Sequence, residues 1–432
     1  MSKNKTKTLQ VPILARVEGE GALAIQIARG KIQSLQLQIY EPPRLFEKFL
    51  EGRRDEEVLD IVARICGICP VAYQMSAVHA LEQCYEIKPT PWIREMRRLF
   101  YCGEWLESHS LHIHFLALPD FLGFKTAPEM AKKYPEEVRR GLRLQALGND
   151  LISLFGGRSV HPVGACLGGF YKAPLLRQVQ ELLVKVENRL ADGKALLQWV
   201  ASLPLANNAH EFMSVSLRHT DEYPMNEGNI VATNGLNIPI ECFDEHFKEL
   251  QVPYSTALHC LLHGQPYLVG PLARVNLNFD HLPEEIKQIV QEAGIHFPSQ
   301  NMYHSIVARA VEIYYCIQEA QRILQHYAYP TSSRLAIQRR EGVGYGCTEA
   351  PRGLLWHSYQ LDENGFVKTA RIVPPTSQNQ ARIEEDLRLS LQQFGLSKED
   401  DVLRAYSEMI IRNYDPCISC STHFLTLKVA RQ

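Results

Sequence analysis

The pattern of apolar and polar positions divides the chain into a short β-rich beginning and a long helical remainder. Between residues 9 and 40, apolar and polar positions alternate on both sides of the turn sequence Arg29-Gly30-Lys31, which predicts a β-hairpin. From residue 44 onward the spacing of apolar residues becomes that of amphipathic helices. Helical spacing covers residues 44–51, 55–65, 92–118, 128–155, 173–202, 283–293, 303–328 and 380–394. The pattern predicts an α+β fold that is predominantly helical, with small β-elements.

The breaks between these segments are short. Proline-rich interruptions fall near residues 87–91, 203–205, 237–239, 266–271 and 373–375. None of them is a long Ser/Gly linker, and no internal repeat is visible. A chain of 432 residues can bury a sizeable core without cross-links. We expect a single domain over residues 1–432, with a hairpin at 9–40 and a mainly helical part at 44–423.

Charge and hydropathy exclude two classes of partner. The chain has 46 Lys and Arg residues against 48 Asp and Glu residues, and no stretch combines basic with aromatic residues, so nucleic acid is not an expected partner. No uninterrupted apolar run reaches the roughly 18 residues of a membrane span. The polar N-terminal sequence carries no apolar stretch typical of a signal peptide. These features predict a cytoplasmic protein.

Eleven cysteines are many for a reduced compartment, and an odd number cannot all form disulfides. Four of them form two Cys-x-x-Cys pairs, Cys66 with Cys69 and Cys417 with Cys420. Thiols three residues apart project from one side of a helical turn, so each pair can face one metal. The sequence Asp415-Pro416 predicts a helix N-cap and first helical residue that would aim Cys417 inward. Four thiolates make a soft donor set that suits nickel, iron or zinc.

A structural zinc site or a redox-active thiol pair is the ordinary explanation of a Cys-x-x-Cys sequence. The two pairs of a zinc site usually lie roughly 15–20 residues apart. Here the pairs lie near opposite ends of the chain. A zinc ion joining the two ends remains an open alternative on spacing alone.

Several sequence blocks, in this order along the chain, resemble the large subunit of nickel–iron hydrogenases. They are Arg16-Val17-Glu18-Gly19, Pro43-Arg44-Leu45-Phe46-Glu47, Arg64-Ile65-Cys66-Gly67-Ile68-Cys69, Gly156-Gly157-Arg158-Ser159-Val160-His161-Pro162, Glu349-Ala350-Pro351-Arg352-Gly353, Val373-Pro374-Pro375-Thr376 and Asp415-Pro416-Cys417-Ile418-Ser419-Cys420 followed by His423. The residues in these blocks are most similar to those of the cytoplasmic, multisubunit branch of the family, which is linked to NAD(P) or another soluble carrier. The resemblance implies the fold of that subunit, with a central helix bundle and small peripheral β-elements.

The resemblance also implies a binuclear metal centre. Cys66 and Cys417 would bind nickel terminally, whereas Cys69 and Cys420 would bridge nickel to an iron that carries carbon monoxide and two cyanides. Thiolates fit this chemistry because charged, polarizable sulfur tunes an electron-rich metal. The implied reaction is the reversible heterolytic cleavage of H2 to protons and electrons.

Further residues take roles by the same resemblance. Glu18 would move protons from a terminal thiolate toward the surface, and the Arg352 guanidinium would point at the iron ligands, held by Asp415. The hydroxyl of Thr376 would donate a hydrogen bond to a cyanide, and Pro375 would form an apolar wall beside it. Each of these residues also has an ordinary explanation as loop or surface chemistry.

A second cation site is implied by Glu47, the backbone carbonyl near Ile372 and His423, which would hold magnesium or iron. A histidine ligand is unusual for a hard cation. The alternative for Glu47 is an exposed helix residue in a salt bridge. The nine residues 424–432 that follow His423 resemble the C-terminal extension that a maturation endopeptidase removes in the family; either they are removed in the same way or this member needs no cleavage.

The chain departs from many relatives at two positions. Tyr73 stands where a histidine often donates a hydrogen bond to a bridging sulfur, and a tyrosine hydroxyl can still donate. Ser108 stands where uptake enzymes have an aspartate, which alters the charge pattern around the metals. Nearby, His109, His112 and His114 look like a ligand cluster, but on a long amphipathic helix we expect them to be satisfied structurally and assign them no metal.

Electron flow implies partners. The chain has neither a Gly-x-Gly-x-x-Gly nucleotide sequence nor a further close-spaced cysteine motif for an iron–sulfur cluster. The resemblance therefore implies an iron–sulfur small subunit that holds the clusters, flavin or NAD(P) diaphorase subunits, and nickel-insertion maturation factors. The alternative is a non-catalytic or hydrogen-sensing subunit whose four cysteines hold zinc or a regulatory metal.

Overall fold

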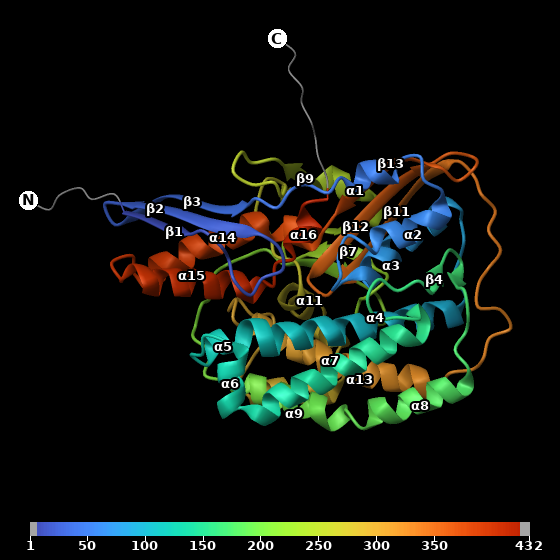
Figure 1. Ribbon diagram of the computed structural model, residues 1–432, viewed down its shortest axis with the longest axis horizontal. Coiled ribbons are helices and arrows are strands. Elements are labelled where there is room, and N and C mark those ends of the chain that lie inside the picture. The colour runs from blue at the N-terminus through green and yellow to red at the C-terminus, as the bar shows by residue number, and fades with distance from the viewer. Residues whose placement is uncertain (1–6, 424–432) are drawn as a thin grey trace, which may run out of the picture.

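The computed structural model describes residues 7–423, and long helices form one side of the molecule (Figure 1). They are α4 (Pro91–Leu111), α7 (Pro135–Gly156), α8 (Leu176–Glu187), α9 (Leu190–Ala201) and α13 (His304–Gln325). Helix α4 begins where the Thr90 hydroxyl accepts a hydrogen bond from the Ile93 amide at 3.3 Å, a standard N-cap. Helices α4 and α7 lie so close together that a Cβ atom at Gly148 would be 2.5 Å from the carbonyl oxygen of Gly103. The α4–α7 contact therefore requires glycine at this crossing.

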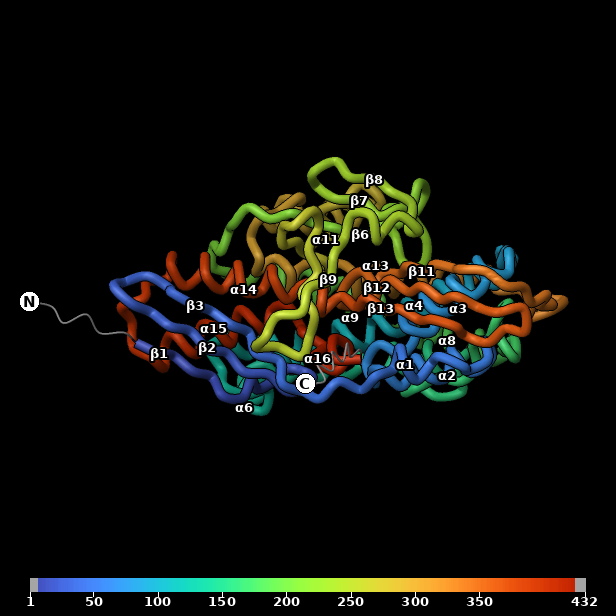
Figure 2. The backbone as a smooth tube through the Cα atoms, turned by 90° about the horizontal axis from the view of Figure 1, so that it is seen from above, coloured from blue at the N-terminus to red at the C-terminus, as the bar shows by residue number. Residues whose placement is uncertain are grey.

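The N-terminal sheet lies on two helices of the C-terminal part (Figures 1 and 2). Strands β1 (Lys7–Val11), β2 (Gly21–Ala28) and β3 (Lys31–Ile39) form an antiparallel meander in that order. Its buried face, with Ile25 and Leu37, packs against α14 (Pro375–Phe394) and α15 (Asp400–Tyr414). The turn at Arg29-Gly30 is where the alternation predicted it. The predicted hairpin is wrong in one respect, because β1 adds a third strand along the edge of β2.

A second meander was not predicted at all. Strands β11 (Gly342–Ala350), β12 (Gly353–Leu361) and β13 (Val367–Val373) pair antiparallel and pack on α3 (Pro70–Cys84). A Cβ atom at Gly346 would lie only 2.0 Å from the carbonyl oxygen of Ser76 in α3. The glycines that make this segment look like a loop are thus the residues that let a strand lie directly on a helix backbone.

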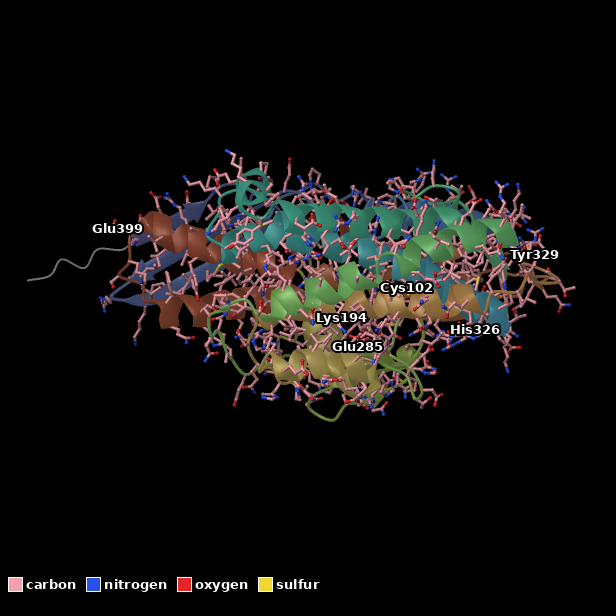
Figure 3. All side chains as sticks on the ribbon, turned by 90° about the horizontal axis from the view of Figure 1, so that it is seen from below. Cys102, Lys194, Glu285, His326, Tyr329 and Glu399 are labelled. Carbon is pink, nitrogen blue, oxygen red and sulfur yellow. The ribbon has the colours of Figure 1, made fainter. Side chains whose placement is uncertain are left out.

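The remaining elements connect these layers. The short strands are β4 (Ala165–Cys166), β5 (Gly169–Phe170), β6 (Val215–Arg218), β7 (Asn229–Ala232), β8 (Asn237–Ile238), β9 (Phe247–Leu250) and β10 (His259–Leu262). The short helices are α1 (Phe46–Leu50), α2 (Asp55–Val62), α5 (Leu118–Phe121), α6 (Ala127–Lys133), α10 (Phe243–His246), α11 (Pro271–Asn278), α12 (Glu284–Glu292) and α16 (Ile418–Ser421), with a π-helical turn at 112–117 and 3-10 turns at 240–242 and 279–281. Lys194 of α9 pairs with Glu285 of α12 at 2.8 Å on the face that Figure 3 shows.

The segment around α16 lies in the middle of the molecule, between the β1–β3 sheet and the β11–β13 sheet (Figure 1). The Ile418 amide donates to the Glu18 carbonyl at 2.9 Å, and the Arg44 amide donates to the Thr422 carbonyl at 2.7 Å. Sequence regions from the two ends of the chain therefore meet here. Among residues 7–423, no helix has both the length and the apolar character that crossing a membrane requires.

Candidate metal centre

Four cysteine side chains converge at this meeting point. The Sγ atoms of Cys66 and Cys417 lie 3.5 Å apart, those of Cys69 and Cys420 lie 3.5 Å apart, and those of Cys417 and Cys420 lie 2.7 Å apart. All four sulfurs lie within 4.8 Å of one another, and all four residues are buried. In the described part of the chain, no other group of three or more His, Cys, Asp or Glu side chains converges in this way.

Local backbone structure directs the thiols. Cys66 lies in the turn between α2 and α3, where its Sγ accepts hydrogen bonds from the Ile68 and Cys69 amides at 3.3 and 3.2 Å. Cys69 directly precedes α3, and Cys417 directly precedes α16. Backbone N–H groups at these helix starts favour negative charge on sulfur.

The predicted N-cap role of Asp415 is wrong. Asp415 has a left-handed backbone with φ of 57° and ends α15, and its amide donates to the Arg412 carbonyl at 3.0 Å. The spacing of apolar residues does not predict α15, and without that helix the pair Asp415-Pro416 resembles the start of the following one. Cys417 follows two residues after Asp415, and its sulfur lies 3.5 Å from that of Cys66.

Four buried thiols this close together cannot all be ionised unless a cation lies among them. Burial raises the pKa of Cys69, Cys417 and Cys420 above the ordinary value. At Cys66, burial also acts to raise the pKa, but hydrogen bonds from Cys417 and Cys420 lower it below the ordinary value. The protein alone therefore stabilises part of the thiolate charge. A soft transition metal would supply the missing positive charge, and a buried set of four sulfurs is the donor set such a metal prefers.

One cation of the protein faces this cluster. Arg352 is buried, and its guanidinium donates from Nε to the Asp415 carbonyl at 2.7 Å and from Nη2 to Asp415 Oδ1 at 3.0 Å. Its Nη1 has no hydrogen-bond partner among residues 7–423. Burial lowers the pKa of Arg352, but Asp415 and the thiols of Cys417 and Cys69 outweigh burial and raise it above the ordinary value. The predicted pairing of Arg352 with Asp415 is present in the structure.

Glu18 contacts the segment that carries Cys417 and Cys420. Its carboxylate accepts a hydrogen bond from the Ser419 amide at 3.0 Å and a second, short one from the Ser419 hydroxyl. Its backbone bridges to Cys417 in parallel orientation. Glu18 is half-buried.

Glu47, Ile372 and His423 also meet, as predicted for a second cation site. The Ile372 amide donates to Glu47 Oε1 at 2.7 Å, and His423 Nε2 lies 2.8 Å from the Ile372 carbonyl oxygen and 3.7 Å from Glu47 Oε1. His423 is completely buried, and its Nδ1 contacts the Cys420 carbonyl. A carboxylate oxygen, a carbonyl oxygen and an imidazole nitrogen thus converge, and this donor set fits a divalent cation.

Thr376, another predicted site residue, contacts the backbone of Cys417. The Cys417 amide donates to the Thr376 hydroxyl at 3.0 Å, which leaves the hydroxyl proton of Thr376 available to another acceptor. Pro375 is the first residue of α14. Burial, followed by the charges of Cys420 and Cys69, raises the pKa of Tyr73 well above its ordinary value, so the phenol keeps its proton beside the sulfurs.

The histidines on α4 and the following turn have structural partners. His109 Nε2 contacts Glu312 Oε2 at 2.9 Å, His112 Nε2 contacts the Arg412 carbonyl at 2.8 Å, and His114 Nδ1 contacts the Ser110 carbonyl at 2.9 Å. All three are buried, as is Ser108. The three imidazole rings therefore contact three different groups and do not converge on one metal position.

One carboxylate near the centre was missed. Glu104 on α4 is buried and accepts hydrogen bonds from the Val71 and Ala72 amides at 2.6 and 3.0 Å, in the first turn of α3. Burial raises its pKa well above the ordinary value. Nothing in the sequence near Glu104 signals this contact, because its partners are backbone amides of another helix.

Comparisons with known proteins agree with this geometry. A family model described as nickel-dependent hydrogenase matches residues 44–141 and 241–423. The alpha subunit of sulfhydrogenase 1 from Pyrococcus furiosus is 32% identical over 98% of this chain and 100% of its own length. A subunit of the F420-non-reducing hydrogenase from Methanothermobacter thermautotrophicus is 30% identical over 95% of this chain and 93% of its own length.

Solved structures show the same fold. The structure of an NAD+-reducing NiFe hydrogenase in the H2-reduced state superposes with a TM-score of 0.87 at 25% identity, covering 97% of this chain and 100% of that one. The chain belongs to the nickel-dependent hydrogenase family, as a large, catalytic subunit. The predicted family and fold class are therefore confirmed, although the β11–β13 sheet is larger than the small elements expected.

Proposed function

We propose that the four cysteines hold the nickel–iron centre at which this hydrogenase subunit cleaves H2 reversibly. In this assignment Cys66 and Cys417 would hold nickel, and Cys69 and Cys420 would hold both nickel and an iron that carries carbon monoxide and cyanide. When bound, the metal pair supplies the electrophile at which H2 is polarised and split. The observation that carries the proposal is the convergence of four buried sulfurs within 4.8 Å from the two ends of the chain.

Proton transfer is assigned to Cys417 and Glu18. Of the two terminal thiolates we assign the one at Cys417, because its backbone bridges directly to that of Glu18. Glu18 holds two hydrogen bonds from Ser419, so its carboxylate is kept in one orientation. We assign the Glu18 carboxylate as the group that accepts the proton released at the sulfur and passes it toward solvent.

Arg352, Asp415, Thr376 and Pro375 shape the remainder of the site. Asp415 occupies two nitrogens of the Arg352 guanidinium and leaves Nη1 for the metal-bound diatomic ligands or the substrate side of the cluster. The Thr376 hydroxyl would donate to a cyanide, since its lone pair already accepts from the Cys417 amide. Pro375 supplies apolar surface beside it. A fixed cation and a fixed donor stabilise charge without reorganising during the reaction.

Glu47, the Ile372 carbonyl and His423 are assigned to a magnesium or iron ion. The support is the convergence of their donor atoms, with His423 linking this site to the backbone of Cys420. A cation here would tie α1, β13 and the Cys417–Cys420 segment together.

We further propose that electrons leave through an iron–sulfur small subunit and reach NAD(P) or another soluble carrier through flavin-containing diaphorase subunits. The support is that the relatives are subunits of multisubunit hydrogenases and that one similar structure is NAD+-reducing. Nickel-insertion factors would load the centre. The predicted C-terminal extension, residues 424–432, lies outside the described residues. If an endopeptidase removes it, the mass of the mature protein would be that of a chain that ends at His423.

An infrared spectrum of the purified complex tests this function. We expect bands in the carbon monoxide and cyanide stretching region that shift under H2, in a preparation that contains both nickel and iron. A nickel-replete, fully matured preparation without such bands, or a preparation whose four thiols hold zinc, would contradict the assignment. The experiment detects the centre directly, before any electron acceptor is known.

A further inference from the structure

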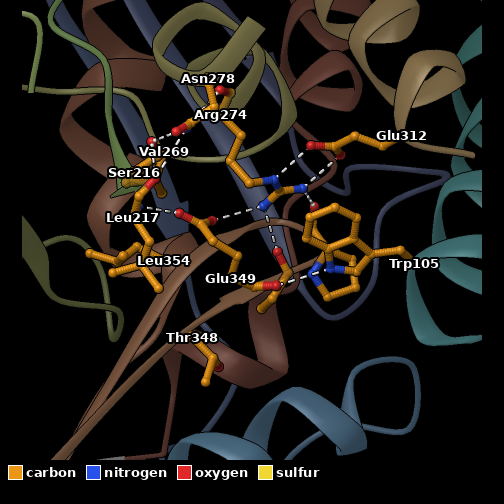
Figure 4. A network of polar contacts seen from close by, with 12 residues as sticks. Trp105, Ser216, Leu217, Val269, Arg274, Asn278, Glu312, Thr348, Glu349 and Leu354 are labelled. Atoms are coloured by element: carbon orange, nitrogen blue, oxygen red, sulfur yellow. Dashed lines mark hydrogen bonds and ion pairs between the residues drawn. The ribbon is translucent and has the colours of Figure 1, made fainter. Parts of the chain in front are cut away.

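A buried ion cluster lies outside the metal-centre residues assigned above. Arg274 on α11 is fully buried and donates to Glu312 twice, from Nε at 2.7 Å and from Nη2 at 2.8 Å. It also donates from Nη1 to Glu349 Oε2 at 3.0 Å. Figure 4 shows Arg274 between the two carboxylates, with its guanidinium 4.3 Å from the centre of the Trp105 ring. Burying such a charge is costly unless the charge is paired and its hydrogen-bond donors are satisfied.

The two carboxylates anchor the cluster to different parts of the fold. Glu312 on α13 also accepts from His109 Nε2 at 2.9 Å and from the Tyr223 hydroxyl at 2.7 Å. Burial acts to raise the pKa of Glu312, but Arg274 outweighs it and lowers the pKa to about 2, so this carboxylate stays ionised at neutral pH. Glu312 therefore ties Arg274 to α13, to α4 through His109 and to the loop residue Tyr223.

The remaining donors of Arg274 bind the backbone next to Arg352. Nη1 donates to the Ala350 carbonyl at 2.7 Å, and Nη2 donates to the Pro351 carbonyl at 3.0 Å. With these bonds all five N–H groups of the guanidinium are used. Glu349 strengthens the anchor, because its Oε1 accepts from the Leu217 amide at 2.7 Å and its carbonyl accepts from Trp105 Nε1 at 2.9 Å.

These contacts converge on the tip of a β-hairpin. Ala350 pairs with Gly353 at the end of the β11–β12 ladder, so Pro351 and Arg352 form the two-residue loop. A hairpin tip has few strand partners to hold it, and carbonyls buried there need donors. The side chain of Arg352 leaves this tip toward Asp415 and the thiols. The hydrogen bonds from Arg274 therefore hold the backbone that aims Arg352.

We infer that Arg274, locked by Glu312 and Glu349, is a positioning residue that sets the direction of the Arg352 guanidinium at the metal centre. The inference rests on the proposed role of Arg352. Arg274 touches neither the thiols nor the substrate side, and it acts only through the Ala350–Pro351 backbone.

A double-mutant cycle on the complete, nickel-loaded complex tests it. Arg274→Lys keeps the charge but lacks the planar five-donor fork, so it cannot bind both carboxylates and both carbonyls. We expect kcat for H2 oxidation to fall roughly 10- to 100-fold, the effect of a small misplacement of a reacting group, with an unchanged KM for H2 and unchanged nickel content. The carbon monoxide and cyanide bands should shift, and a crystal structure of the variant should show the Arg352–Asp415 contacts displaced.

The second arm of the cycle separates positioning from general stability. In an Arg352→Lys background, Arg274→Lys should cause no further loss of kcat, because its effect passes through the replaced side chain. Arg97→Lys is the matched control. Arg97 and Glu82 form another buried bidentate pair, at 2.7 and 2.6 Å, between α4 and α3. This control should lower the melting temperature while leaving the infrared bands in place.

The outcomes are distinguishable. If Arg352→Lys alone leaves kcat unchanged, the proposed role of Arg352 fails, and the inference fails with it. If Arg352→Lys is slow but Arg274→Lys is not, or if the two losses multiply, the inference alone is overturned. Should Arg274→Lys not fold, Glu349→Gln serves instead, since it keeps the Arg274–Glu312 pair and an acceptor for the Leu217 amide. Glu349→Gln should lower kcat several-fold when Arg352 is present and cause no further loss in the Arg352→Lys background.

Discussion

The carboxylate of Glu18 accepts a hydrogen bond of 3.0 Å from the backbone amide of Ser419, a residue 401 positions further along the chain. Ser419 lies between Cys417 and Cys420, in the segment that supplies half of the thiol cluster. The proposed proton acceptor is therefore tied to the short piece of backbone that carries the sulfurs of Cys417 and Cys420. Any movement of this segment would displace the carboxylate and the thiols together, which keeps the distance for proton transfer constant.

Glu18→Gln should slow H2 oxidation by about 100-fold or more, the usual contribution of a positioned acid–base group. The amide oxygen of glutamine can still accept from Ser419, so the metals should remain bound, but an amide cannot carry the proton. Turnover and nickel content of the variant complex give the measurement. Glu20→Gln, at the exposed position two residues further on, is the control and should retain full activity. A fully active Glu18→Gln variant would remove this residue from the proton route.

Glu47→Gln should weaken binding of the second cation by at least about tenfold, because it removes the one negatively charged ligand of that site. Metal analysis after dialysis against a chelator should show loss of magnesium or iron beyond the iron of the main centre, with nickel retained. The melting temperature should fall, since the cation would join α1, β13 and the C-terminal segment. Glu51→Gln is the control, because Glu51 pairs with Lys48 at the surface. Equal cation content in the two variants would contradict the site.

Gly346→Ala should reduce the free energy of unfolding by about 1–3 kcal/mol, the usual cost of overpacking. The new methyl group would lie 2.0 Å from the Ser76 carbonyl oxygen, so β11 must move away from α3. Urea denaturation measures the change. Val343→Ala, on the same strand with 47% of the side chain exposed, should change stability by less than about 0.5 kcal/mol. Similar values for the two variants would mean that β11 and α3 do not pack as closely as described.

Acid should destabilise the fold through its buried histidines. Burial lowers the pKa of His114 to about 4, with a smaller contribution from Arg140, and burial likewise lowers the pKa of His79 to about 4. Below about pH 6.5 the unfolded chain binds protons that the folded chain does not, so stability falls as the pH is lowered from about 6.5 toward 4.

His114→Gln isolates one of these contributions. The loss of stability between pH 7 and pH 5 should be roughly 2 kcal/mol smaller in the variant, because one group no longer takes up a proton on unfolding. Urea denaturation at the two pH values checks this difference. An unchanged loss in the variant would show that His114 is already protonated in the folded protein at pH 5.

Local patterns predicted those parts of the molecule that local interactions form. The turn at Arg29-Gly30 and the helices α12 and α13 lie where alternation and helical spacing placed them. The β11–β13 sheet escaped prediction because glycines at 344 and 346 remove the apolar alternation that marks a strand. Their side-chain positions are filled by the backbone of α3, which is a tertiary relationship and leaves no periodic signal. The same applies to Asp415, whose left-handed conformation follows from an unpredicted helix before it.

The sequence by itself determined which chemical groups the site can use, namely two Cys-x-x-Cys pairs and the carboxylates Glu18 and Glu47. It also contains the sequence blocks that identify the family. Only the tertiary structure decided which groups meet. Cys66 and Cys417 are separated by 351 positions, and their sulfurs lie 3.5 Å apart. The β1–β3 sheet, α14 and α15 bury their apolar faces in one core with Ile418 of α16, whereas Cys66 and Cys417 share a second core with apolar residues of β12 and β13. The support of Arg352 by Arg274 arises in the same way. Side-chain donors find backbone carbonyls of a distant hairpin, and such contacts depend on long-range packing rather than on residue spacing.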